Sequence, residues 1–245
     1  MLLKYLITFF FSNFKSECRK CSSPGYVLLQ KQDVYCAQCL QDHCIQKFRS
    51  AIGKSRMIKS DDHVLICVSG GTGSVAMLDM INFCQQLPDV YKRIRYIPSI
   101  LYVHEGFLNN EEPIKKNILD YFLSSELTVY ITTLEQCLND SSIELIKINN
   151  FTDDTHSVIN NFCKESSEKY GFKLKGIFDK LKSLSSKQDF LSKLRLMTIS
   201  RIAKELGIEK IFLGSTMSEL AIDLMNDMGL GKGMQIHSLT VSFCY

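Results

Sequence analysis

The sequence predicts an α/β protein whose main domain is a doubly wound, mainly parallel sheet, preceded by a small cysteine-rich module. Three observations support this prediction: two close cysteine pairs near the N-terminus, short apolar runs that alternate with amphipathic stretches from residue 61 onward, and a glycine-rich turn after the first of these runs. Alternating strands and helices are typical of a parallel sheet with helices on both faces. A chain of 245 residues is long enough for such a domain and a small module.

The same patterns divide the chain into four segments. We assign residues 1–16 to an apolar leader, 17–45 to the cysteine module, 46–60 to a basic linker and 61–245 to the α/β domain. The leader resembles the apolar part of a signal peptide, but charged and polar residues follow it instead of a small-residue cleavage site. A packed leader, a disordered leader and a mispredicted start of the coding sequence remain as alternatives to a secretory signal.

Composition and cysteine usage limit the classes of protein. The formal net charge is +3, so bulk charge alone does not predict a nucleic-acid partner. Ten cysteines, of which four form the two pairs and the others are scattered, favour a reducing compartment over a secreted disulfide scaffold. No later segment reaches the roughly 20 consecutive apolar residues of a membrane helix. We therefore expect a cytoplasmic protein without a membrane partner.

The N-terminal cysteines have the spacing of a metal site. Cys18-x-x-Cys21 is followed by Cys36-x-x-Cys39, and Pro24-Gly25 in the intervening stretch predicts a turn. Two residues between paired thiols let both sulfurs face one tetrahedral ion, and a hairpin brings the two pairs together. Zinc with four thiolate ligands is the expected, structural ion. A redox pair or an iron–sulfur site remains open.

The linker carries a cluster of positive charge. Five basic residues fall within thirteen positions that contain no acid: Lys47, Arg49, Lys54, Arg56 and Lys59. Such a cluster, with Phe48 inside it, is compatible with RNA phosphates. A solvated helical face after a helix that begins near Leu40 explains the charges equally well.

The elements of the main domain follow in order. Apolar runs predict strands over 63–68, 96–103, 128–132, 143–148 and 209–213, and helical spacing predicts helices over 75–87, 111–124, 187–206 and 217–228. The polar, lysine-rich stretch 153–186 reads as helices joined by loops. Ligands of such sheets bind beyond the carboxyl ends of the strands, so the loops after Val68, Val103, Thr132 and Leu213 are expected to surround any site.

The stretch from Ser69 to Ser74, SGGTGS, lies between a strand and a helix. Its glycines let backbone N–H groups converge, and the start of the helix adds partial positive charge, which together make a cradle for an anion. It lacks the lysine of a P-loop.

This loop resembles the SGGxDS loop of the N-type ATP pyrophosphatases, which adenylate a carbonyl oxygen. Four residues match that loop, and the resemblance implies that they are the nucleotide-binding residues of a degenerate site: Ser69, Gly70, Gly71 and Ser74. The resemblance implies an adenine nucleotide alpha hydrolase-like fold with a PP-loop. Gly73, however, stands where that family has its acid. The family's GHNxDD motif corresponds here to 214–219, GSTMSE, which keeps the glycine but lacks the His-Asn pair and the first acid; Glu219 is a partial substitute. The missing acids argue against bound ATP and Mg²⁺.

The order of knuckle, KFRSAIGKSRMI, strand and SGG loop is similar to that of tRNA thiolation enzymes. The altered loop and the segment LAIDLMNDMGLGKG, residues 220–233, resemble one group of them, the cytoplasmic tRNA 2-thiolation protein 2 family. The apolar leader departs from the polar start of that family. The family also continues well past this segment, so we expect the α/β domain to be truncated at its C-terminus.

The resemblance implies a role beside a catalytic sister subunit. That pair replaces the 2-oxygen of the wobble uridine in lysine, glutamine and glutamate tRNAs with sulfur from a thiocarboxylated ubiquitin-related modifier. We therefore expect a heterodimer subunit that binds tRNA and has a degenerate ATP site. Two alternatives remain: an adenylating sulfurtransferase active on its own, and a zinc-bearing interaction domain unrelated to RNA. No catalytic residue is assigned, and Cys137 is interpreted as structural.

Overall fold

The computed structural model describes residues 17–29, 33–88, 94–106, 108, 114–139, 141–149 and 155–232. The predicted leader and the end of the chain from Gly233 lie outside the described residues. Contacts divide the chain into two compact units. Unit 1 comprises Met1–Ser60, Gly71–Arg95 and Gly214–Tyr245, and unit 2 comprises Asp61–Gly70 and Tyr96–Leu213. The chain passes from unit 2 into unit 1 within the glycine-rich loop, after Gly70, and again after the last strand, at Gly214.

The described part of unit 1 contains the cysteine module and three helices. Strands β1 (Val27–Leu29) and β2 (Asp33–Tyr35) form an antiparallel hairpin, which leads into α2 (Ala37–Ser55). Helix α2 contacts α3 (Thr72–Gln86), and α8 (Met217–Gly229) completes the unit. Helix α2 continues through the position where the sequence places the boundary between knuckle and linker.

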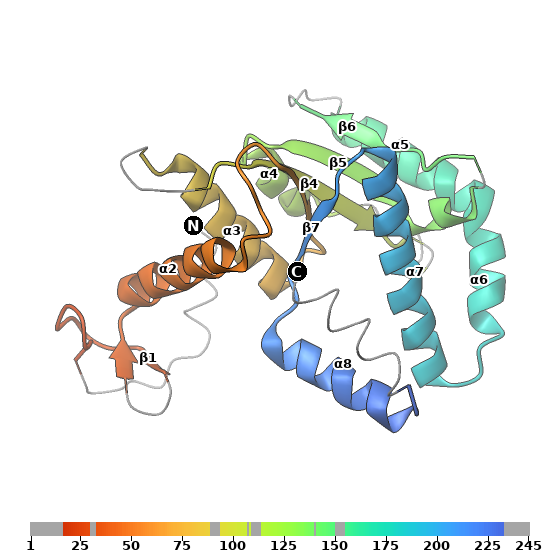
Figure 1. Ribbon diagram of the computed structural model, residues 1–245. Coiled ribbons are helices and arrows are strands. Elements are labelled where there is room, and N and C mark those ends of the chain that lie inside the picture. Colours follow the sequence, from red (N-terminus) through yellow and green to blue (C-terminus); the bar gives the residue numbers. More distant parts are fainter. Residues whose placement is uncertain are drawn as a thin grey trace. The chain divides into compact units, whose positions relative to one another are not determined.

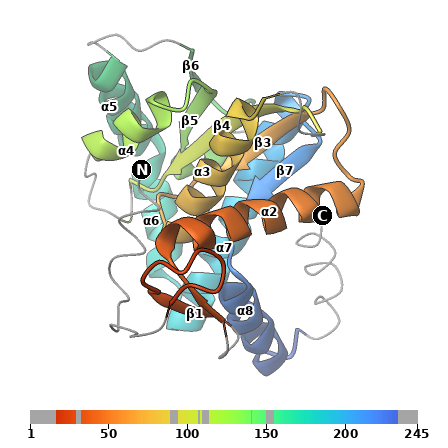
Figure 2. The same cartoon turned by 90° about the vertical axis from the view of Figure 1, so that its left-hand side faces the viewer.

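Unit 2 is built on a five-stranded sheet. Its strands are β3 (His63–Cys67), β4 (Ile97–His104), β5 (Thr128–Thr133), β6 (Ile146–Ile148) and β7 (Lys210–Leu213). They are arranged in the order β6-β5-β4-β3-β7. Figure 2 shows β5, β4, β3 and β7 from left to right, with β6 above β5. All neighbours are parallel except β5 and β6. The predicted α/β class with a mainly parallel sheet is confirmed.

Helices cover both faces of this sheet, as alternate strand residues require. On one face, Leu65 and Leu101 form a buried cluster with Ile202 of α7 (Leu184–Glu205). On the other face, the ring of Tyr102 contacts Phe122 of α4 (Lys116–Leu123). The double winding predicted from the sequence is therefore present within unit 2.

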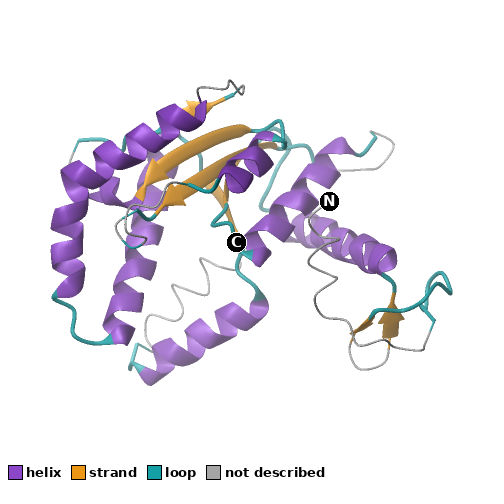
Figure 3. Cartoon of the chain, turned by 180° about the vertical axis from the view of Figure 1, so that it is seen from behind, coloured by secondary structure: helices purple, strands orange, loops and turns teal. Residues whose placement is uncertain are grey.

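The lysine-rich stretch forms helices, as predicted. Helix α5 (Thr155–Ser166) continues through a single π-helical turn, Ser167–Gly171, into α6 (Phe172–Asp179). A short turn then reverses the chain into α7, and α6 and α7 lie side by side (Figures 1 and 3). Leu174 and Leu194 are buried between them, with Phe178 and Phe190 packed against the same cluster.

The strands match their predicted ranges to within one residue at each end, apart from the fourth strand. There, the sequence predicts 143–148, but β6 spans only Ile146–Ile148. Ile143 is buried in the core without belonging to a strand, because its backbone N–H donates to the Glu205 carboxylate on α7 and not to a neighbouring strand.

A candidate metal centre and a glycine-rich loop

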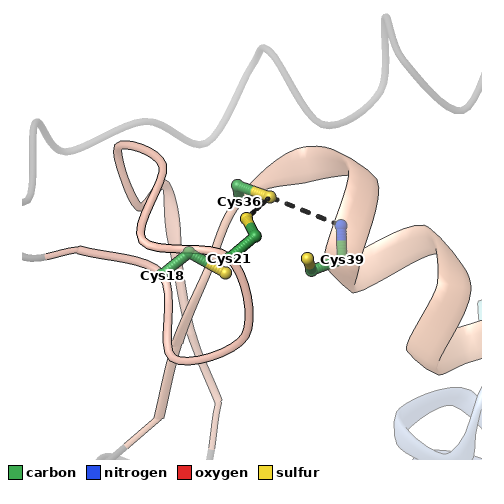
Figure 4. Close-up of side chains that lie close together, drawn as sticks. All are labelled: Cys18, Cys21, Cys36 and Cys39. Carbon is green, nitrogen blue, oxygen red and sulfur yellow. Dashed lines mark hydrogen bonds between the residues drawn. The ribbon is translucent and has the colours of Figure 1, made fainter.

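The four N-terminal cysteines meet in space. The Sγ atoms of Cys18, Cys21, Cys36 and Cys39 all lie within 4.8 Å of one another. Figure 4 shows the sulfurs turned toward one another, two from the first turn and two from the start of α2. Cys21 Sγ and Cys36 Sγ are 3.5 Å apart. The sequence spacing therefore produces the clustered donor set that it predicts.

Local backbone geometry explains why both pairs face inward. Ser22 adopts a left-handed conformation (φ 56°), and its N–H donates to Cys18 O at 3.0 Å, which closes the first turn around its two thiols. Cys36 caps α2: its Sγ accepts from the N–H of Cys39 at 3.4 Å. The first turn is tied to the hairpin because Arg19 N–H donates to Val34 O. Each pair is thus held by its own turn.

The thiols of the cluster are close enough to influence one another's protonation. Burial raises the pKa of Cys18, but backbone hydrogen bonds at Cys36, Lys20 and Cys21 lower it overall to about 6. Hydrogen bonding with the sulfurs of Cys21 and Cys36, followed by burial, raises the pKa of Cys39 to about 12. Thiolates this close repel one another, so four can coexist only around a cation. The donor set can hold one metal ion.

The five basic residues of the predicted linker do not share one face. Lys47 and Lys54 lie on one side of α2, two turns apart. Arg49 points about 200° around the helix axis from Lys47, at about 100° per residue. Arg56 follows the helix in a left-handed conformation (φ 55°), and Lys59 lies in the segment beyond it. Lys47, Lys54, Arg56 and Lys59 are exposed.

The glycine-rich loop begins where β3 ends. Val68 N–H still donates to Leu101 O at 3.0 Å, and the chain then leaves the sheet. Gly70 has φ +80°, a conformation that L-residues with side chains rarely adopt, so glycine is required there. Gly71 is the N-cap of α3 without a side-chain cap, so α3 begins inside the SGGTGS stretch. The predicted order of strand, glycine loop and helix is present.

The middle of the loop is closed by a second backbone segment. A Cβ at Gly73 would lie 2.4 Å from the carbonyl oxygen of Gly214, the residue that follows β7. Conversely, a Cβ at Gly214 would lie 2.3 Å from Ser74 Cα and 2.7 Å from Ser74 N. Real Cβ contacts are not this short. The position that carries the acid in the SGGxDS motif therefore has no room for any side chain.

Two further polar groups near this approach are already bonded within their own elements. The Ser74 hydroxyl is buried and donates to Gly71 O at 2.9 Å. Glu219 Oε2 accepts from Thr216 N–H at 2.7 Å, and Glu219 N–H donates to Thr216 Oγ1 at 3.3 Å. This reciprocal pair is a capping box at the start of α8. The carboxylate considered as a metal ligand thus has a structural partner.

Three described cysteines of unit 2 are not activated nucleophiles. Burial raises the pKa of Cys67 to about 12, of Cys137 to about 11 and of Cys163 to about 12, with a further increase from Glu135 for the last two. A thiol with a raised pKa is a poor nucleophile. This agrees with the interpretation of Cys137 as structural.

Sequence reasoning missed one buried acid and two polar contacts of unit 2; for Glu105, which follows a predicted strand, it favoured a bond to solvent or backbone. Glu135 is fully buried in the 3₁₀ helix Leu134–Leu138, directly after β5. Glu105, after β4, accepts both an Nε and an NH2 hydrogen bond from Arg195 of α7. Arg201 donates to the carbonyl oxygens of Cys137 and Asn139, at 3.0 and 2.9 Å. None of these contacts is local in sequence, so no motif indicates them.

Comparison with known proteins identifies similar sequences among curated tRNA thiolation proteins. No family model matches the chain. It is 25% identical over 261 residues to "Cytoplasmic tRNA 2-thiolation protein 2" of Danio rerio, covering 94% of this chain and 52% of that protein. It is 28% identical over 233 residues to the protein of the same name from Anopheles gambiae, covering 93% and 52%. These similarities confirm the predicted resemblance, and the chain spans about half the length of these curated relatives.

A solved structure has the same fold. The U34-tRNA thiolase NcsA from Methanococcus maripaludis, with its [4Fe-4S] cluster, superposes with a TM-score of 0.58 at 16% identity, covering 92% of this chain and 62% of that one. The predicted fold is thereby confirmed. The predicted cytoplasmic location agrees with the names of the curated relatives. None of the described helices combines the length and apolar content that crossing a bilayer requires.

Proposed function

We propose that this chain is a tRNA-binding, non-catalytic subunit of a cytosolic complex that 2-thiolates the wobble uridine of tRNA. Its tRNA substrates would be those for lysine, glutamine and glutamate, and a catalytic sister subunit would carry out the reaction. A thiocarboxylated ubiquitin-related modifier would supply the sulfur. The names of the curated relatives and the fold shared with a tRNA thiolase support the general role.

One observation carries the assignment of catalysis to the partner: the backbone of Gly214 fills the space that a side chain at Gly73 would need. Adenylation of the uridine oxygen releases pyrophosphate, and the negative charge that develops on the phosphates must be neutralised by Mg²⁺ and the acids that hold it. Position 73 has no acid and no room for one. Glu219, the remaining candidate, caps α8.

The residue assignments for binding follow from exposure and charge. We assign tRNA backbone contacts to the exposed side chains at the end of α2 and beyond, with Lys54 and Arg56 at their centre. Cys18, Cys21, Cys36 and Cys39 hold a structural zinc ion, because four thiolates leave no open coordination position for a substrate. When bound, zinc fixes the two turns that precede α2 and so supports the start of that helix.

The decisive experiment measures AMP formation from ATP in the presence of tRNA. We expect the purified chain alone to form none above background. The chain coexpressed with the catalytic sister should form AMP in proportion to the amount of thiolated uridine. As a matched pair, Ser74→Ala in this chain should leave the activity of the complex unchanged, whereas replacing the SGGxDS aspartate of the sister should abolish it. Robust turnover by this chain alone would instead establish the alternative, an independent sulfurtransferase.

Binding of tRNA is tested separately. Lys54→Glu with Arg56→Glu should weaken tRNA binding and reduce the salt dependence of affinity, by about 1 in log–log slope per lost phosphate contact. Lys164→Glu with Lys204→Glu changes the charge equally at two exposed positions elsewhere and serves as the control. Equal binding by both variants and the unaltered chain would favour a zinc-bearing interaction domain unrelated to RNA.

A further inference from the structure

Helix α6 presents an exposed aromatic ring among lysines, a feature that neither the fold nor the proposed function explains. Phe172 is 91% exposed, the largest exposed fraction given for a large apolar side chain in the described part of the protein. The segment 169–187, which runs from the end of the π-helical turn to the start of α7, contains six lysines and one acid. Its formal charge of +5 exceeds that of the whole chain, +3.

The helix geometry holds Phe172 away from the protein. Leu174 is buried against α7, and Phe172 lies about 160° from it around the axis at about 100° per residue. Gly171 is buried as well, and a Cβ there would lie 4.0 Å from Glu135 Cγ, which follows β5, so this side of the helical segment faces the protein. The π-helical turn immediately precedes Phe172, and such insertions are frequent at functional sites.

The surroundings of the ring suit a flat, anionic ligand. Lys173 and Lys175 are both exposed and lie about 100° to either side of Leu174, so they flank the ring. Gly176 lies one turn further along on the side of Phe172, and no described atom lies within 4 Å of a Cβ placed there. Glycine inside a helix costs about 1 kcal/mol relative to alanine. No described steric contact requires glycine at this position, and it leaves the helix surface beside the ring open.

Two lysines at the ends of the segment 169–187 contact aromatic rings of the same segment. Lys169 Nζ lies 4.9 Å from the ring centre of Tyr170, and Lys187 Nζ lies 4.9 Å from that of Phe178. These contacts place positive charge at both ends of the segment. Single-stranded nucleic acids are bound by this combination, in which bases stack on aromatic side chains while basic residues follow the backbone.

We propose that α6 is a second RNA-contact surface, on which an unpaired base stacks on Phe172 while Lys173 and Lys175 contact the adjacent phosphates. This inference rests on the proposed function, and it adds a contact in unit 2 to the basic residues of α2 in unit 1. A membrane surface is the less suitable ligand. The other exposed apolar side chains nearby, Ile177 and Leu184, lie on another side of α6 and on α7, so the described residues form no continuous apolar face.

The test measures the affinity of the full chain for an unmodified tRNA transcript by fluorescence anisotropy. Phe172→Ala should weaken binding about tenfold, toward the lower end of what the loss of one base stack costs. Phe172→Tyr should stay within about twofold of the unaltered chain because it keeps the ring. Lys173→Glu with Lys175→Glu should make the log–log salt slope shallower by about 2. The pair Lys164→Glu and Lys204→Glu is the charge-matched control.

Gly176→Leu separates binding from stability. Leucine should stabilise α6, because it is a better helix former than glycine, yet it should weaken tRNA binding because it covers the surface beside the ring. A blunt-ended RNA duplex should bind equally to Phe172→Ala and to the unaltered chain. If the unaltered chain binds no tRNA, the proposed function fails. If it binds tRNA and Phe172→Ala binds as tightly, only the present inference is overturned. It is also overturned if Phe172→Ala reduces binding to phosphatidylserine vesicles but not to tRNA.

Discussion

The close approach of Gly73 and Gly214 makes a prediction whose sign is unusual. Gly73 lies in the first turn of α3 and has no positive φ, so its backbone conformation is one that alanine also adopts. Replacing such a helical glycine by alanine ordinarily stabilises a protein by about 0.5–1 kcal/mol. Here the new Cβ would lie 2.4 Å from Gly214 O and 3.2 Å from Thr216 Cγ2. We therefore expect Gly73→Ala to destabilise the protein.

The magnitude follows from two opposing effects. Forcing an extra methyl group into a filled space costs about 1–3 kcal/mol, and the gain in helix propensity offsets up to about 1 kcal/mol of it. The net loss should be about 1–2 kcal/mol. For a chain of this size, a change of 1 kcal/mol shifts the midpoint of thermal unfolding by about 2–4 °C. The midpoint should therefore fall by about 2–8 °C.

Thermal unfolding followed by circular dichroism measures this effect, and the chain offers its own control. Gly53 lies in α2, in the same unit, and no described atom lies within 4 Å of a Cβ placed there. Gly53→Ala should raise the midpoint or leave it unchanged. If Gly73→Ala proves as stable as Gly53→Ala, the two backbones do not meet as described. The steric account of the lost acid would then be wrong.

Three further predictions concern the metal centre and two polar contacts. Cys36→Ser should reduce bound metal, measured by plasma mass spectrometry, from one ion per chain to background, and retained stoichiometric metal would exclude Cys36 as a ligand. Thr216→Ala removes the N-cap of α8 and should lower the free energy of unfolding, measured in urea, by about 0.5–2 kcal/mol. Glu219→Gln keeps an acceptor and should lower it less. Loss of Mg²⁺ binding in the Gln variant would contradict the capping role. Arg201→Met should lower the free energy of unfolding by about 1–3 kcal/mol in the same assay, because the carbonyls of Cys137 and Asn139 lose a charged donor. Arg201→Lys should recover part of this loss. Unchanged stability of the Met variant would show that water replaces the donor.

The sequence predicts those features whose physical cause is local. Most strand and helix ranges follow from hydrophobic periodicity, although α4 begins at Lys116, later than the predicted helix 111–124. The knuckle follows from the spacing of Cys18, Cys21, Cys36 and Cys39. The predicted strand 143–148 begins too early, since β6 starts at Ile146. Periodicity alone does not distinguish a buried residue in a loop, such as Ile143, from a residue in a strand. Thr216-x-x-Glu219 has the pattern of a capping box, which the sequence also reveals. Because this segment also corresponds to the GHNxDD motif, the sequence favours the interpretation of Glu219 as a metal ligand.

The features that the sequence does not reveal depend on contacts between distant segments. From the sequence alone, Gly73 shows only that the acid of the motif is missing. The position of Gly214 in the structure shows in addition that no acidic side chain fits there. Phe172 has no distinctive neighbours in sequence, since lysine-rich stretches are usually solvated. Its significance depends on the burial of Gly171 and Leu174, which fixes the side of α6 that faces solvent. Tertiary packing decides both cases.

The close approach of Gly73 to Gly214 and the RNA contact proposed for α6 depend on different parts of the fold. Cys67 and Leu213 are register partners in neighbouring parallel strands, so the segments that leave β3 and β7 start side by side. Glycine at both 73 and 214 lets these segments touch, and each glycine then excludes a side chain at the other's position. Restoring an aspartate at 73 alone would therefore disturb the packing before it could assist chemistry. The positions of the lysines and Phe172 of α6 depend instead on packing within unit 2, so the RNA contacts proposed there do not depend on the conformation of the glycine-rich loop.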